Sequence, residues 1–466
     1  MTQTTLTRRL LLRRAAQLGF MGAAGPLALN LAAVGEAAAF DATDYKALVC
    51  LFLYGGNDYA NTVVPFDLSN YDRYSAIRGG GPGRTRGGIA YGRDELVATA
   101  LTPVGGPALT DDLQYALAPS LPGLKSLFDA ETLAVQLNVG PLVAPLTLAE
   151  YQRPNAPLPP KLFSHNDQQS VWQALASEGA TAGWGGRLGD LALSSNGNAM
   201  LSCISAASNA VFVSGRQALQ YQISPQGAVG INLLKEPYYA PAAIRDALRD
   251  NIRQSSAHVF EEAYAAVTRR SIDQAVIANG ALSNVTLNTA FAANNPLANQ
   301  MRIVARLIGA RTALDMRRQV FFVSLGGFDH HNTLMRDHPP LMAKLNDAMS
   351  AFYAATVELG VSDNVVTFTA SDFGRTLTSN ADGSDHGWGG HHFVMGGAVR
   401  GGRFYGTAPQ VSVSSDDQVG QGRLLPSTSI DEFGGTLARW FGADVSEVAD
   451  VFPNSGRFAH ANVAFL

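Results

Sequence analysis

The sequence predicts an α/β fold, a mostly parallel β-sheet with helices on both faces. Short uninterrupted apolar runs bounded by glycine, such as residues 47–54 and 319–325, are typical of strands buried on both faces. These runs alternate along the chain with segments of helical periodicity, as expected for strand–helix–strand units. The runs also lead into loops with aspartate and histidine, and in open α/β sheets ligands bind at the carboxyl ends of strands.

The order of elements follows from the apolar pattern. We expect core strands at residues 47–54, 132–139, 319–325, 364–369 and 392–395. We expect helices at residues 120–128, 167–177, 241–277, 296–312, 340–359 and 429–441. Several prolines between residues 141 and 160 predict an extended loop over the sheet edge.

Composition places the chain among globular proteins. Its 466 residues are enough for a large core, 46% of them are hydrophobic and only 15% are charged. The net charge of −4 gives no electrostatic basis for nucleic-acid binding. We expect one large domain over residues 40–466, with insertions at 79–106 and 199–229.

Residues 1–39 have the features of a twin-arginine signal peptide. Arg8 and Arg9 begin a basic segment, an apolar stretch rich in Ala and Gly follows, and cleavage is expected before Phe40. The alternative is an uncleaved membrane anchor, but Gly and Pro interrupt the short apolar stretch, so we expect no stable span in the mature chain. We therefore expect a periplasmic or secreted protein, exported folded by the twin-arginine machinery, which favours cofactor loading before export.

The sequence has two cysteines, Cys50 and Cys203, too few for a four-thiolate zinc site. They could pair in an oxidising periplasm, but Cys50 lies inside an expected buried strand. We expect two buried thiols, because free cysteine is often a small core residue.

Histidines cluster in two glycine-rich loops, which hold five of the nine in the chain. In the first loop, side chains of an extended segment alternate, so Asp329 and His331 point to one side and His330 to the other. A carboxylate with an imidazole suits zinc, manganese or iron. The alternative is a polar loop whose histidines bond to backbone carbonyls.

Two further strand ends carry carboxylates. Asp58 follows Gly55-Gly56-Asn57, where an Asx turn is the alternative to a ligand role. Asp372 follows the strand expected at 364–369. Nearby, Arg375 either clamps an anionic substrate or only pairs with the aspartate.

The second glycine-rich loop contains Asp385 and His386, of which the histidine is the stronger candidate ligand. His391 and His392 follow at the start of an expected strand. Because side chains alternate along a strand, only one of that pair can face the same cavity as His386.

Ser164 and His165 come just before an expected helix. Capping of the helix is the commonest role for a serine at this place. A helix N-terminus also stabilises an anion or an activated nucleophile, which would put Ser164 or His165 beside the metal. The chain has no Gly-x-Ser-x-Gly elbow and no phosphate-binding Gly-Lys-Ser loop.

The order of these motifs resembles the domain of unknown function 1501 family of exported bacterial proteins, over essentially the whole mature chain. The motifs that carry the resemblance are FLYGGNDYANTVVP, FSHNDQQSVWQ, GGFDHHNT and FTASDFGRTLTSNADGSDHGWGGHH. That family is similar to the alkaline phosphatase and sulfatase superfamily, whose members bind two metals at the carboxyl edge of a parallel sheet. The resemblance therefore implies an alkaline phosphatase-like domain.

The resemblance also implies a role for each candidate. Asp58 resembles the metal carboxylate after the first strand, and Asp329 with His331 resembles the Asp/His pair on one metal. Ser371-Asp372 resembles the strand-end pair of the other metal. His386 resembles the later histidine that returns to the first metal.

We therefore expect an exported metal-dependent hydrolase of phosphate, sulfate or related acidic esters, with one or two divalent ions. The metal would polarise the substrate, a small-molecule or polymer ester, and Arg375 would hold its non-reacting oxygens. Phe373 departs from the pattern, because the superfamily usually has histidine there. The alternatives are a non-catalytic envelope or surface protein that keeps a hydrolase scaffold, and a polymer-binding partner.

Overall fold

The computed structural model describes residues 42–80, 88–106, 108–228, 241–254, 258–459 and 463–466. The expected signal peptide at 1–39 lies outside the described residues. So do residues 81–87 of the first expected insertion and residue 229 of the second.

The fold is built on one ten-stranded sheet in the order β11-β4-β10-β9-β1-β8-β5-β6-β7, with β12 also paired to β4. At its centre β1 (Lys46–Tyr54) runs parallel to β8 (Arg318–Gly326) on one side and to β9 (Val365–Ser371) on the other. The other strands are β4 (Leu133–Gly140), β5 (Cys203–Ser205), β6 (Tyr221–Ser224), β7 (Gly227–Ala228), β10 (Gly390–Met395), β11 (Phe404–Tyr405) and β12 (Thr428–Ser429).

The predicted fold class is confirmed, and the five expected strands are β1, β4, β8, β9 and β10. One of them, β10, runs antiparallel to both of its neighbours, β9 and β4. The chain leaves β9 and returns as the adjacent strand without a crossover helix, which makes the pairing antiparallel. The connecting loop, residues 372–389, therefore stays at the carboxyl end of β9.

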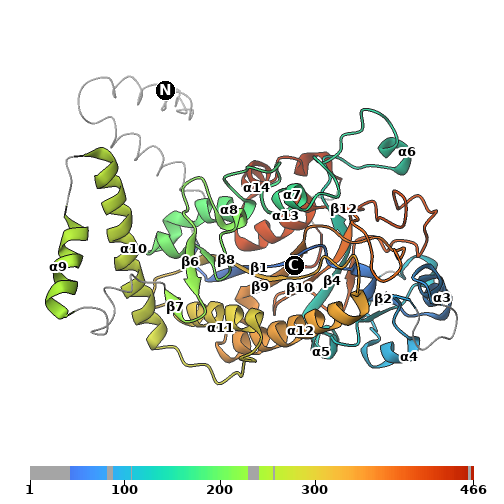
Figure 1. The fold of residues 1–466 in the computed structure, drawn as a ribbon, viewed down its shortest axis with the longest axis horizontal. Helices are drawn as coiled ribbons and strands as arrows, with labels where there is room; N and C mark the ends of the chain where they lie inside the picture. Colours follow the sequence, from blue (N-terminus) through green and yellow to red (C-terminus); the bar gives the residue numbers. More distant parts are fainter. Residues whose placement is uncertain (1–41, 81–87, 107, 229–240, 255–257, 460–462) are drawn as a thin grey trace, which may run out of the picture.

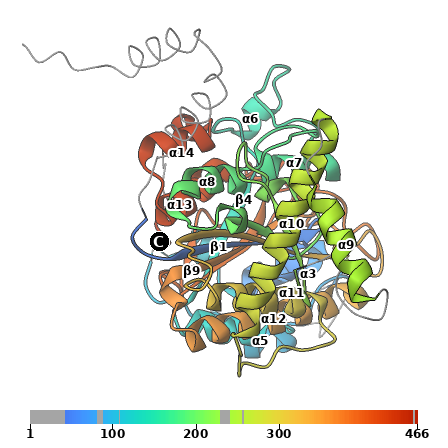
Figure 2. The ribbon, with the colours of Figure 1, turned by 90° about the vertical axis from the view of Figure 1, so that its left-hand side faces the viewer.

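Strand β1 shows why the central strands are apolar throughout. Leu48, Cys50 and Phe52 pack into the core on one face of the sheet, and the alternate residues Val49 and Leu51 pack into the core on the other. One face is covered by α5 (Pro122–Asp129), α11 (Pro296–Gly309) and α12 (Leu334–Glu358). The opposite face is covered by α7 (His165–Ala174), α8 (Trp184–Ala192), α13 (Ile430–Phe441) and α14 (Val445–Val451), as Figures 1 and 2 show.

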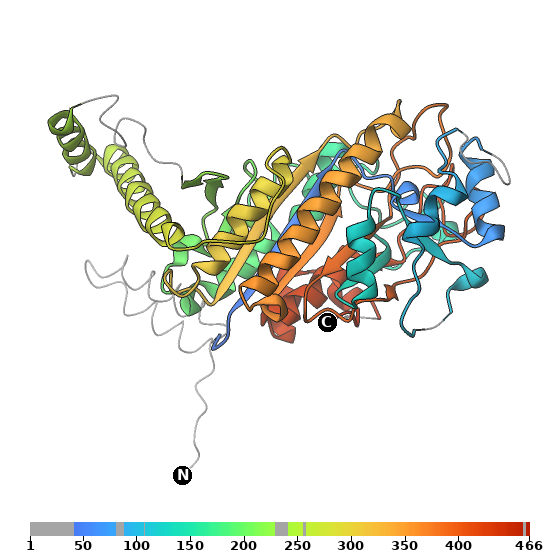
Figure 3. The same ribbon diagram turned by 90° about the horizontal axis from the view of Figure 1, so that it is seen from below.

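Two helix predictions need correction. The segment expected as one helix at 241–277 forms α9 (Ala242–Arg253) and α10 (Val259–Ser283), because Gln254 is extended and ends α9. Both helices project from the body of the molecule (Figure 3). The helix expected to begin at Pro340 begins at Leu334, so Pro339 and Pro340 lie inside α12. Proline favours a first helical turn, and that preference misplaced the predicted start.

The two expected insertions differ. In the region 199–229, β5, β6 and β7 extend the main sheet at its β8 side. In the region 79–106 the described residues form only the short helix α4 (Arg93–Leu96) and one helical turn. Several elements were not predicted from the sequence: α3 (Leu68–Ile77), α6 (Leu148–Tyr151) in the proline-rich loop, α8, α14, and the small sheet of β2 (Val63–Pro65) and β3 (Tyr115–Leu117).

Cys50 and Cys203 are both buried and free, as expected. Burial raises the pKa of both thiols, because a thiolate would lose its hydration. Among the described residues no helix is both long enough and apolar enough to cross a membrane.

Candidate functional site

The site lies at the carboxyl edge of the three central parallel strands. Leu53 of β1 pairs with Ser371 of β9, and Tyr54 pairs with Gly326 of β8, so the three strands end at the same level. Asp329 and Asp372 follow the ends of β8 and β9, on either side of the end of β1. The predicted convergence of these distant segments at one sheet edge is therefore present.

Gly55 contacts both of the segments that carry Asp329 and Asp372. Its N–H donates to Asp372 Oδ1 at 3.1 Å. Its φ is +115°, and a Cβ there would lie 2.4 Å from the backbone nitrogen of Asp329. Only glycine permits both the left-handed backbone and this close approach. Gly55 is thus required by packing against the segment that carries Asp329, whereas a Cβ on Gly56 would meet the ring of Phe373.

The loop 372–389 folds back on itself through an antiparallel bridge between Arg375 and His386. A Cβ on Gly387 would lie 2.4 Å from the carbonyl oxygen of Gly374, so two backbones touch here. This closure brings His386 from a position far along the loop back toward Asp372. The glycine-rich composition of the loop therefore serves to place His386.

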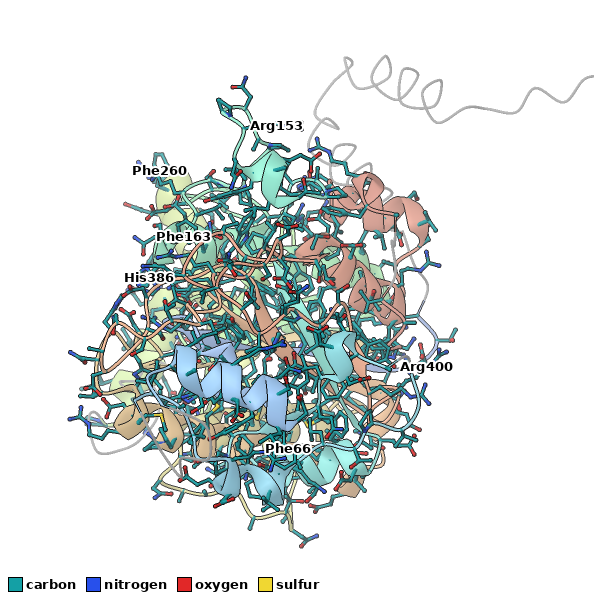
Figure 4. All side chains as sticks on the ribbon, turned by 90° about the vertical axis from the view of Figure 1, so that its right-hand side faces the viewer. Phe66, Arg153, Phe163, Phe260, His386 and Arg400 are labelled. Carbon is teal, nitrogen blue, oxygen red and sulfur yellow. The ribbon has the colours of Figure 1, made fainter. Side chains whose placement is uncertain are left out.

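Three imidazoles surround one carboxylate, and we call these four residues the histidine–aspartate cluster: His165, His331, His386 and Asp329. The Nε2 atoms of His165, His331 and His386 lie 3.5, 3.1 and 3.4 Å from an Asp329 carboxylate oxygen. The Nε2 atoms of His331 and His386 are 2.9 Å apart. Figure 4 labels His386 and, beside it, Phe163.

Each imidazole of the cluster is held through its other nitrogen. His165 Nδ1 lies 2.6 Å from Asp372 Oδ2, and His331 Nδ1 lies 3.2 Å from Asp385 Oδ1. His386 Nδ1 lies 2.7 Å from the carbonyl oxygen of Phe163. An oxygen acceptor at Nδ1 fixes the proton there and leaves Nε2 free to bind a metal, the usual arrangement of metal-ligating histidine.

The donor set fits a divalent transition metal. His165, Asp329 and His386 offer ligand atoms that all lie within 4.8 Å of one another. Nε2 of His165 is buried and has no hydrogen-bond partner among the described residues, which is costly unless a ligand binds it. Two imidazoles and a carboxylate suit zinc, manganese or iron better than calcium. These three residues are therefore the ones that would hold the ion.

The charges of the site also favour a cation. Asp372 is fully buried, and its partners are the Gly55 N–H, the Gln169 amide at 2.8 Å and the His165 imidazole. No lysine or arginine of the described chain forms an ion pair with it. A buried carboxylate without a paired cation is unfavourable. A divalent ion bound through His165 would compensate this charge.

The protonation of the cluster follows from burial and neighbours. The hydrogen bond to Asp372 raises the pKa of His165. Burial lowers the pKa of His386 by disfavouring the imidazolium. Burial opposes ionisation of Asp329, but the hydrogen bond and charge of Arg375 hold the pKa of this carboxyl below its ordinary value.

Arg375 is placed differently from the expected substrate clamp. Its side chain is fully buried and donates to Asp329 Oδ1 at 2.9 Å, to Gly55 O at 3.0 Å and to the Ser384 carbonyl. The guanidinium has no open face for a substrate oxygen. It positions Asp329 instead, so an Arg–Asp pair is present, but its aspartate is Asp329 and not the neighbouring Asp372.

Asp58 does not join the cluster. Its Oδ2 accepts from Arg78 at 2.7 Å and from the Ser384 hydroxyl at 2.9 Å, and its Oδ1 accepts from the backbone N–H of Asn61. The carboxylate and guanidinium are both buried. The structure therefore gives Asp58 a buried ion pair and the Asx-type turn that was the alternative interpretation.

Ser164 is the N-terminal cap residue of α7, and its hydroxyl donates to Asp167 Oδ2 at 2.9 Å. His330 is buried on the side away from the cluster, as the alternation predicted. The other two histidines of the second loop region lie outside the cluster: the ring of His391 packs against Tyr59, and that of His392 against Trp172.

Two residues of the site, Gln169 and Phe163, were not predicted from the sequence. Gln169 lies one turn after His165 in α7 and donates to Asp372, and its i, i+4 spacing from His165 could have indicated this. Phe163 has a φ of +71°, a strained conformation that aims its carbonyl at His386. Phe373, in the place of the histidine typical of the superfamily, packs its ring against both His165 and His386.

Most of the chain matches one known protein family. Residues 45–444 match the family described as Protein of unknown function (DUF1501). The chain belongs to this family. The family predicted from the motifs is confirmed, and the matched residues include every member of the histidine–aspartate cluster.

No curated protein matches this DUF1501 chain. One solved structure that resembles it is Ps i-CgsB in complex with k-i-k-neocarrahexaose, with a TM-score of 0.36, 10% identity and coverage of 88% of this chain and 76% of that one. Another is the lipoteichoic acid synthase LtaP from Listeria monocytogenes, with a TM-score of 0.32, 7% identity and coverage of 89% and 78%. The fold assignment rests on the topology of the ten-stranded sheet.

Proposed function

We propose that this DUF1501 protein is a metal-dependent hydrolase of phosphate, sulfate or related acidic esters. The observation that supports it is the histidine–aspartate cluster, in which each Nδ1 is anchored and each Nε2 faces Asp329. The resemblance of the motifs to the alkaline phosphatase and sulfatase superfamily supports an acidic ester as the class of substrate. A divalent ion would supply Lewis-acid polarisation of the ester oxygen.

In this proposal His165, Asp329 and His386 hold one ion. Three protein ligands with an open position are typical of catalytic metal sites, whereas four protein ligands are typical of structural ones. The side chains of Asp329 and His331 are 45% and 46% exposed, so a substrate can reach the cluster from solvent. Asp372, Gln169 and Arg375 position the ligands from the buried side.

His331 is the proposed base that accepts a proton from the attacking water molecule. It is exposed, and Asp385 contacts its Nδ1 at 3.2 Å, so its Nε2 can act as a base oriented by a carboxylate. Water is the simplest nucleophile, because the Ser164 hydroxyl is already bonded to Asp167.

The test combines metal content with turnover. The mature protein is purified, its metals are measured by elemental analysis, and aryl phosphate and sulfate esters are screened. We expect about one ion per chain and turnover that Asp329→Ala abolishes. His258→Ala, which changes an exposed histidine far from the cluster in the sequence, is the control. Turnover that survives Asp329→Ala would show that the reaction occurs elsewhere.

A second variant separates catalysis from a non-catalytic scaffold. If His331 is the base, His331→Ala keeps the ion and loses most of its turnover, because general-base catalysis contributes about 10²–10⁴-fold. If His331 is instead a fourth ligand, the same variant loses metal. A metal site of four protein ligands with no turnover would favour the scaffold alternative, an envelope protein that binds without reacting.

We further propose that Arg8 and Arg9 direct export by the twin-arginine pathway. Replacing both with lysine should leave the protein in the cytoplasm, measured by cell fractionation. Export that is unchanged in this variant would exclude the pathway.

A further inference from the structure

A hollow at the carboxyl edge of the sheet is separate from the cluster, because none of the four cluster residues lines it. It is a cavity of about 750 Å³. Its walls come from the end of β4, from α6 and the residues beside it, and from the segments 407–417 and 425–427. A volume of this size suits a ligand larger than a single small anion.

The polar lining consists of uncharged groups and carboxylates. Hydroxyls come from Thr147, Thr407, Ser414, Ser415 and Ser427, carboxamides come from Asn138, Gln152 and Gln410, and carboxylates come from Asp416 and Asp417. None of these lining residues is lysine, arginine or histidine. Such a lining offers hydrogen bonds to hydroxyl groups but would repel a highly anionic ligand.

Several of these groups are available to a ligand. Within the described part of the chain, the side chains of Gln152, Thr407, Gln410 and Asp416 make no hydrogen bond to the protein. Others are already fixed: the backbone N–H of Gln410 donates to Asp417 Oδ2 at 2.7 Å, and the Asn138 amide donates to the Leu425 carbonyl at 2.8 Å. The cavity therefore combines preorganised walls with free hydrogen-bonding groups.

The cavity and the cluster lie on one side of the molecule. Strands β4 and β9 are separated only by β10, so their carboxyl ends are about 10 Å apart at the usual strand spacing. Both strands run antiparallel to β10, so both ends point to the same edge.

We propose that this cavity binds the uncharged, hydroxyl-rich part of the substrate, a segment of neutral oligosaccharide next to the ester group. This deepens and rests on the proposed hydrolase function: the cluster takes the acidic ester, and the cavity takes the sugar residues that follow. An anionic polymer with a charge on every residue is disfavoured because Asp416 and Asp417 line the cavity.

Binding can be tested without the reaction. The mature protein as purified is titrated with maltohexaose, cellohexaose and chitohexaose by isothermal titration calorimetry. We expect at least one of them to bind, and Ala149→Arg to weaken binding about tenfold or more by filling the cavity. Gln410→Ala with Asp416→Ala, which adds no bulk, should also weaken it. Val413→Arg is the control, because Val413 is exposed on the same segment but does not line the cavity.

The proposal is overturned if the wild type binds none of the three hexasaccharides, or if wild type and Ala149→Arg bind them equally. Binding of an extended peptide pool instead would assign the cavity to another ligand class and would also overturn it. Hydrolysis of p-nitrophenyl phosphate is measured in the same variants and should be unchanged. If the wild type shows no turnover at all, the proposed hydrolase function is wrong, but the binding result still stands.

Discussion

Asp372 is a buried carboxylate whose role is set by its neighbours at the residue scale. The sequence predicted it as a metal ligand, but its two oxygens contact the Gly55 N–H, the Gln169 amide and His165 Nδ1. It therefore orients His165 rather than facing the open side of the site. Orientation of a ligand by a second carboxylate is common in metal sites.

We expect Asp372→Asn to weaken metal binding by about 10- to 100-fold, because the amide is a poorer acceptor for His165 Nδ1–H and favours the wrong tautomer. The dissociation constant is measured by competition with a chelator. Asp363→Asn, an exposed aspartate near the opposite end of β9, is the matched control. If the metal affinity of Asp372→Asn is unchanged, Asp372 does not contribute to metal binding.

Asp58 provides a second test at this scale, because its predicted role as a ligand and its observed ion pair with Arg78 have different consequences. Asp58→Asn should lower the free energy of unfolding by about 3–5 kcal/mol, since it leaves a buried guanidinium without its charge partner. It should leave the metal content of the folded protein unchanged. Denaturant unfolding and elemental analysis measure the two effects, and loss of metal from folded protein would restore the ligand role.

At the scale of elements, α13 was predicted correctly from the sequence, but the burial of its acidic residue Asp431 was not. The helix begins where expected, with Ser429 and Glu432 forming a capping box. Acidic residues in a first helical turn usually face solvent and interact with the helix dipole, yet Asp431 is buried and accepts the backbone N–H of Asn454. Burial raises the pKa of Asp431 to about 6.

The pH dependence of stability follows from this shift. The folded-state pKa lies above the ordinary value of 3.8, so the folded protein holds the proton more tightly than the unfolded chain. The contribution of Asp431 is complete below pH about 4 and is lost as the pH rises through about 6, a change of about 3 kcal/mol. Asp431→Asn should reduce the pH dependence of the free energy of unfolding between pH 4 and 7. Asp450→Asn, an exposed neighbour in α14, should not.

At the scale of the whole molecule, the site joins segments that are far apart in the chain. His165, Asp329 and His386 come from different parts of the sequence, so an ion bound to them crosslinks the carboxyl edge of the sheet. Because only the folded chain assembles this site, an ion bound there would stabilise the fold by mass action.

Removal of the ion should therefore lower the melting temperature. At free metal a hundredfold above its dissociation constant, the stabilisation is about 2.7 kcal/mol. Thermal unfolding is compared with and without a chelator, and with zinc or manganese added back. The Asp329→Ala variant should show little response to either treatment. Equal responses of the variant and the wild type would place the metal elsewhere.

Much of the fold was predictable because it depends on local patterns. The double-sided burial of β1 follows from its uninterrupted apolar run, and the start of α13 follows from its capping box. The break between α9 and α10 was missed, because the helical periodicity on both sides outweighed the polar residues 254–258, whose serines favour the start of a new helix. The antiparallel direction of β10 was also hidden, since an apolar strand has the same pattern in either direction.

The sequence by itself determined the fold class, the family and the acidic and imidazole groups available to the site, because residue type and spacing are local properties. Only the tertiary structure decided which of these groups meet. Asp58 binds Arg78 and Ser384 and so lies outside the cluster, and Asp372 contacts His165. Which partner a carboxylate finds depends on how strands and loops distant in sequence pack together, and no local pattern records that.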